Sequence, residues 1–121
     1  PQFVNYSDPT KNIDDRAKAY LDINCAHCHN KTGPAQTSGL FLDWRTTDRA
    51  AYGFFKTPIA AGRGSGNLQF DIHPGKPNES ILLYRMQSTD PGVMMPEVSR
   101  KLIHAEGVKL ISDWIKSMKT E

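Results

Sequence analysis

The two cysteines of this chain, Cys25 and Cys28, lie three positions apart, and a histidine, His29, follows directly. A disulfide stabilises a fold mainly by closing a long loop in the unfolded chain, so cysteines at this spacing cannot serve as a staple. The 121 residues contain no further cysteine from which a disulfide framework could be built. The chain therefore has to fold around an apolar core, and the two thiols call for a chemical explanation.

The composition supports one domain with such a core. Apolar residues make up 38% of the chain and charged residues 23%, and the net charge is only +2, far from the basic excess typical of nucleic-acid binding. No apolar run approaches the roughly 18 residues of a membrane span, so we expect no transmembrane segment. Because the chain starts at Pro1 without a basic and apolar leader, we expect a mature form or a domain of a longer chain.

Periodic patterns predict a mainly helical domain. Residues 1–11 are polar and turn-rich and are expected to be an extended lead-in or linker remnant, followed by one domain over residues 12–121. Apolar residues at helical spacing and capping residues such as Asn12 and Asn78 predict helices over residues 13–24, 48–55, 78–87 and 105–118. Residues 31–76 read mostly as loop, with short alternating stretches around 40–44 and 68–72. We expect an all-α fold with room for a small β-hairpin in the middle.

The run Cys25-Ala26-His27-Cys28-His29 is the C-x-x-C-H pattern of covalent c-type haem attachment. Each thiol adds to one haem vinyl group, and the histidine is then placed to ligate the iron. Random reordering of this composition gives the pattern about five times in 10,000. A zinc site would need a second ligand pair, which His73 and His104 do not form at their spacing, and a thioredoxin-type site would need a βαβ pattern that is absent.

Over residues 14–118 the sequence resembles a class I c-type cytochrome domain. The resemblance rests on a helical segment leading into CAHCH, on Gly33-Pro34, on Met95-Pro96 and on a last helix ending in ISDWI. The stretches AAGRGSGNLQFDI and MMPEVSRKLIHAEGVKLISDWI also resemble the C-terminal cytochrome domain of larger bacterial haem proteins. The resemblance implies the cytochrome c fold, in which the first and last helices cross and loops wrap one haem.

The resemblance also implies further site residues. The sixth iron ligand in the family is usually a methionine followed by proline, which points to Met95, with Met94 as the alternative and bis-histidine ligation through His73 or His104 as another. The carbonyl of Pro34 is implied as the acceptor for the His29 ring N–H.

Three further groups of residues are candidates on chemical grounds. Arg63, in a glycine-rich loop, could pair with a haem propionate. Trp44 and Tyr84 are large enough to wall the haem or to belong to the core. Trp114 fits a place at the crossing of two helices.

We therefore expect a mono-haem protein that transfers one electron to or from a redox partner protein or a neighbouring domain and catalyses no bond-making itself. Two propionates would nearly cancel the charge of +2, so partner contact through an apolar rim is expected. Covalent haem attachment outside the cytoplasm implies a periplasmic or secreted location in bacteria. The alternative is a haem enzyme or gas sensor with an open or displaceable sixth position, and a third is a structural zinc module.

Overall fold

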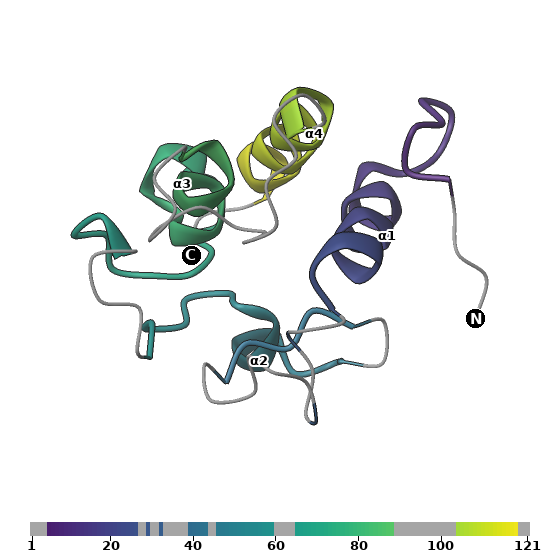
Figure 1. Ribbon diagram of the computed structural model, residues 1–121. Coiled ribbons are helices and arrows are strands. Elements are labelled where there is room, and N and C mark those ends of the chain that lie inside the picture. The colour runs from purple at the N-terminus through teal and green to yellow at the C-terminus, as the bar shows by residue number, and fades with distance from the viewer. Residues whose placement is uncertain are drawn as a thin grey trace.

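The computed structural model describes residues 5–26, 29, 32, 39–43, 46–59, 65–88 and 104–118. Four α-helices and one 3-10 helix make up the regular structure of this part: α1 (Ile13–Asn24), α2 (Arg49–Tyr52), η3 (Pro77–Glu79), α3 (Ile81–Gln87) and α4 (His104–Ser117) (Figure 1). No β-strand occurs among these residues, which confirms the all-α expectation for the part of the chain that is described. None of these helices is long and apolar enough to cross a membrane.

Helix α1 has the bounds that the sequence predicts. The Asn12 side chain accepts a hydrogen bond of 2.7 Å from the Asp14 backbone N–H, which satisfies one of the free donors of the first turn. At the other end the Cys25 N–H donates to the Leu21 carbonyl at 2.8 Å. Helix α1 therefore delivers the first cysteine of the motif at its carboxyl end.

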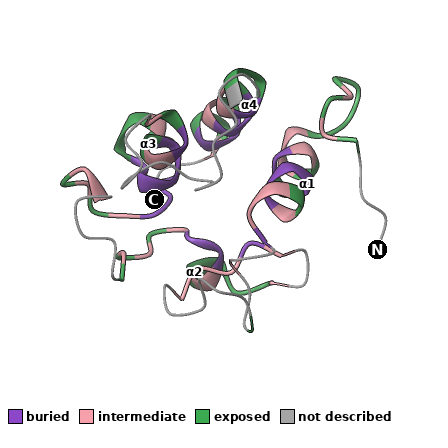
Figure 2. Ribbon diagram, in the orientation of Figure 1, coloured by how far each residue is buried: buried purple, intermediate pink, exposed green. Residues whose placement is uncertain are grey.

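Helix α4 packs against both α1 and α3 and forms the centre of the core. Figure 2 shows buried residues on the sides of α3 and α4 that face each other. Trp114, which is 1% exposed, donates its Nε1–H to Asp14 Oδ1 at 3.0 Å and so ties α4 to the start of α1. This contact confirms the predicted place of Trp114 between two helices. Among the large apolar members of the core are Tyr20, Leu21, Leu83, Ile111, Trp114 and Ile115.

The start of α3 differs from the prediction. Asn78 lies in η3 and caps no helix, and α3 begins only at Ile81, after Ser80. The reason is the buried hydroxyl of Ser80, which accepts from the His73 N–H at 2.8 Å and donates to the Lys76 carbonyl at 3.0 Å. These bonds hold the preceding turn against α3, so the helix does not begin before Ile81.

The prediction for the faces of α3 is correct at three positions and wrong at one. Ile81, Leu82 and Met86 are buried, as their spacing predicts. Tyr84 is 37% exposed. It lies midway between Leu82 and Met86, which are one turn apart and are both buried, so Tyr84 falls on the opposite side of the helix. Tyr84 is also not among the residues that line the pocket described below.

The middle of the chain forms isolated bridges where a hairpin was expected. Phe54 pairs with Ile72, and Phe70 with Ser80, each through a single parallel bridge. Phe55, directly after the first bridge, adopts a left-handed conformation with φ of 54°, which turns the chain away before a ladder can extend. The backbone around these bridges nevertheless carries residues that line one side of the pocket described below.

Residues 5–11, the predicted lead-in, form turns that lie against α1. The Tyr6 ring meets the Tyr20 ring edge-on, with 5.3 Å between the centroids. Arg16 Nε donates to the Tyr6 carbonyl at 2.9 Å. The described part of this segment therefore packs on the domain.

Candidate functional site

Cys25 and His29 line a common pocket together with residues from three other parts of the chain. The pocket has a cavity volume of about 70 Å³, and part of it is open to solvent. Most of its wall is apolar, and two charged side chains interrupt it. The other lining residues are Leu40, Leu42, Pro58, Ile59, Asp71, Ile81, Leu82 and Arg85.

A backbone hydrogen bond joins Cys25 to His29, the first and last residues of the C-x-x-C-H run. The His29 N–H donates to the Cys25 carbonyl at 2.9 Å, which is the i to i+4 bond of an α-helix. One turn brings residues four apart to the same side, so the Cys25 thiol and the His29 imidazole lie on one wall of the pocket. Cys28, the second thiol of the motif, lies outside the described residues.

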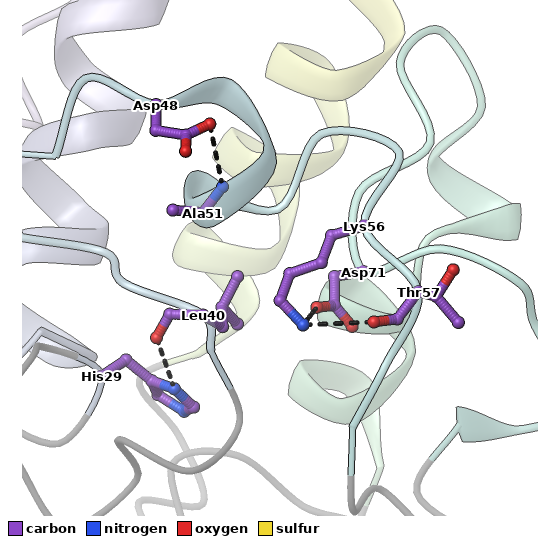
Figure 3. A network of polar contacts seen from close by, with 7 residues as sticks. All are labelled: His29, Leu40, Asp48, Ala51, Lys56, Thr57 and Asp71. Atoms are coloured by element: carbon purple, nitrogen blue, oxygen red, sulfur yellow. Dashed lines mark hydrogen bonds and ion pairs between the residues drawn. The ribbon is translucent and has the colours of Figure 1, made fainter.

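The ring of His29 is oriented by a short segment eleven residues further along the chain. Its Nδ1 lies 3.3 Å from the Leu40 carbonyl oxygen (Figure 3). The His29 carbonyl accepts from the Leu42 N–H at 2.8 Å. A carbonyl can only accept, so the ring contact, although long, favours the tautomer with the proton on Nδ1. In that tautomer Nε2 is the ring nitrogen that carries the lone pair a metal ligand needs.

Helix α2 supports this segment from behind. The Phe41 N–H donates to the Ala51 carbonyl at 2.8 Å, and Asp48 caps the helix by accepting from the Ala50 N–H at 3.0 Å. Gly53 ends α2 with φ of 116°, and a Cβ at this position would lie 3.0 Å from Leu40 Cδ1. A glycine is therefore needed both for the backbone conformation and for the approach of Leu40.

The polar side of the pocket is an ion pair with a second cation nearby. Asp71 is 7% exposed, and its Oδ2 lies 3.5 Å from Lys56 Nζ, which also donates to the Thr57 carbonyl at 3.1 Å (Figure 3). Arg85 shares the pocket with Asp71. Burial raises the pKa of the Asp71 carboxyl, and the positive charges of Lys56 and Arg85 offset part of that rise.

Backbone hydrogen bonds explain why Asp71 lies at this place. Its N–H donates to the Lys56 carbonyl at 2.7 Å, and its carbonyl accepts from the Leu82 N–H at 2.9 Å. Asp71 is thus fixed between the segment that carries Lys56 and the first turn of α3, which carries Arg85. The charged groups meet because the backbone brings their segments together.

Sequence reasoning missed Lys56, Asp71 and Arg85. It selected Arg63 as the cation of the site, and Arg63 lies outside the described residues. A usable signal existed for Arg85, which follows the buried Ile81 by one helical turn and so shares its side of α3. The pairing of Lys56 with Asp71 has no comparable signal, because it depends on contact between two loop segments.

Tyr52 was also missed, and its phenol is buried near enough to Cys25 to interact with it electrostatically. Its ring stacks on Phe54 and meets Trp114 edge-on, and no residue that the structure describes forms a hydrogen bond with its hydroxyl. Burial raises the pKa of this phenol, and the neighbouring Cys25 and acidic side chains raise it further. Tyr52 therefore stays protonated at neutral pH.

The remaining predicted site residues fall into two groups. His73 is half-buried between the rings of Phe55 and Phe70, and it is not among the residues that line the pocket. His29 is accordingly the only histidine on the pocket wall within the described ranges. The predictions for Pro34, Trp44, Arg63, Met94 and Met95 lie outside the described residues, and for His104 only the backbone, at the start of α4, is described.

Comparison of the chain with protein-family models, with curated proteins and with solved structures gave no match. The donor set itself is nevertheless compatible with a c-type haem. It offers a thiol and an imidazole one helical turn apart, a tautomer that places the ring lone pair on Nε2 and a largely apolar pocket beside them.

Proposed function

We propose that this protein transfers single electrons through one haem covalently attached at Cys25 and Cys28, with His29 and Met95 as axial ligands, on a class I cytochrome c fold. The observation that supports this proposal best is the shared pocket of Cys25 and His29, with the His29 Nδ1 held near the Leu40 carbonyl. The C-x-x-C-H spacing supplies the attachment chemistry.

Haem, when bound, supplies the one-electron couple of its iron. The chain's own residues would fix its environment. The Leu40 carbonyl holds the His29 ring in one orientation, which also makes Nε2 a better donor. Leu40, Leu42 and Leu82 exclude water from the same space. A methionine thioether from the segment before α4 raises the reduction potential relative to a second imidazole.

The proposed partner is a redox protein or a neighbouring domain, met through an apolar rim. Ile59 is 56% exposed and lines the pocket, so it provides apolar surface at the mouth of the pocket. Haem attachment outside the cytoplasm places the protein in the periplasm or outside the cell. A rate of electron exchange that falls steeply with salt would contradict the apolar rim.

The test is maturation in a bacterium that exports the chain and attaches haem covalently. The intact mass should include one haem, and a pyridine haemochrome spectrum should show its vinyl groups saturated. Cys25→Ala should lose one of the two thioether bonds, and His29→Ala should lose the native absorption spectrum. The control His73→Ala should keep both thioether bonds and the native spectrum. A mature protein without covalent haem would refute the proposal, and rapid binding of carbon monoxide by the reduced protein would favour the open-site alternative.

A further inference from the structure

The carboxylate of Asp71 lies in the pocket where, according to the proposed function, haem would be held and would accept an electron. Its side chain is 10% exposed and faces the same space as Cys25 and His29. Buried carboxylates are uncommon unless they are paired, and Lys56 supplies that pair at 3.5 Å. The remaining exposure is enough for exchange of a proton with solvent.

The charged groups around Asp71 make its protonation sensitive to an added negative charge. Among the described residues these are Lys56, from the segment after α2, and Arg85, from α3. Cys25 and His29 share the pocket. Neither would take up or release a proton once Cys25 is held in a thioether and His29 is bound to a metal ion. Burial already opposes ionisation of the carboxyl, so charge is less screened here than at the surface.

We propose that Asp71 takes up a proton when the site takes up an electron, which deepens the proposed function and rests on it. The electron would come from a reduced partner protein, which would be oxidised by one electron, and the haem iron, when present, would supply the one-electron acceptor. The proton comes from solvent and forms an O–H bond at the carboxylate. Lys56 is then left as an unbalanced positive charge, still bonded to the Thr57 carbonyl, and offsets the added electron. Reoxidation returns the proton to solvent.

The experiment measures the midpoint potential of the haem-loaded protein against pH for the natural chain and for Asp71→Asn. The natural chain should lose potential as pH rises through the range in which Asp71 titrates. The limit is a tenfold change in the redox equilibrium constant per pH unit, about 59 mV for one electron. Asp71→Asn should be flat over that range. The matched control is Asp113→Asn, which removes an exposed carboxylate paired with Lys109 on α4 and should keep the slope.

A second readout does not depend on whether Asp71→Asn folds. The Asp71 carboxyl, followed by carbon NMR in the natural protein, should have a higher pKa in the reduced state than in the oxidised state. Lys56→Met should move the sloping range to higher pH, because it removes the charge that favours the carboxylate.

The outcomes separate this inference from the proposed function. Three results, each obtained with covalent haem present, would overturn the role of Asp71 and leave electron transfer standing. They are a midpoint potential that does not change with pH, a slope that is the same in Asp71→Asn as in the natural chain, and an Asp71 pKa that is equal in the two redox states. A slope that survives in Asp71→Asn would assign the proton to another group, such as a propionate. Absence of covalent haem would overturn both.

Discussion

Substitution of Gly107 by alanine tests how closely α4 approaches α1. Gly107 is buried on α4, and a Cβ at this position would overlap the phenol ring of Tyr20. Overpacking of a core costs about 1–3 kcal/mol, and we take the upper end because the overlapped atoms belong to a buried ring. Alanine regains about 1 kcal/mol over glycine in a helix, so the net loss in the free energy of unfolding should be about 2 kcal/mol. For a chain of this size that loss corresponds to about 8 °C in Tm.

Urea unfolding of the matured protein, followed by far-UV circular dichroism, measures this loss. Glu106→Ala, an exposed neighbour in the same turn, should change the free energy by no more than about 0.5 kcal/mol. In a Tyr20→Leu background, which removes the overlapped ring atoms, Gly107→Ala should cost little or become stabilising. If Gly107→Ala unfolds at the natural midpoint, or costs the same with and without the Tyr20 ring, the reasoning is refuted.

Four further outcomes follow from the described contacts and the proposed ligands. Met95→Ala should lower the potential sharply and abolish the sulfur-to-iron charge-transfer band while Met94→Ala keeps both, and the reverse pattern would make Met94 the ligand. Ser80→Ala should cost about 1–3 kcal/mol in urea unfolding because it leaves the part-buried His73 N–H without its acceptor, and an unchanged midpoint would contradict this. Tyr52→Phe should raise stability by about 1 kcal/mol because it removes a buried hydroxyl without a partner among the described residues, whereas a loss would reveal one. Since the pKa of Asp71 is raised in the folded state, its contribution to stability is present in acid and is lost as pH rises through that pKa, and unfolding of Asp71→Asn across this range should lack that loss.

The helices could be predicted where periodicity and capping agree. Residues 13–24 carry a helical apolar pattern behind Asn12, and the structure gives α1 the same bounds. The start of α3 could not be predicted, because Asn78 and Ser80 are both good capping residues. Only the fold determines which hydroxyl is buried against the His73 backbone.

The site could be predicted only as far as local spacing reaches. The C-x-x-C-H pattern is a property of five consecutive residues, and its first and last residues, Cys25 and His29, line the same pocket. The contact of His29 with Leu40 and the pair of Lys56 with Asp71 depend on how glycine-rich loops close over one another. Such loops have no periodicity, so the sequence offers no register from which to derive these contacts.

The walls of the pocket come from four stretches of chain: the turn that ends α1, residues 40–42, residues 58–59, and residue 71 with α3. A molecule lodged among them replaces interior atoms that the polypeptide does not provide, and without it these stretches face an incompletely filled interior. If haem is attached as proposed, biosynthesis must follow a fixed order. Cys25 would have to stay accessible until haem is joined to it, and the segments that carry residues 40–42 and 58–59 would close over it only afterwards.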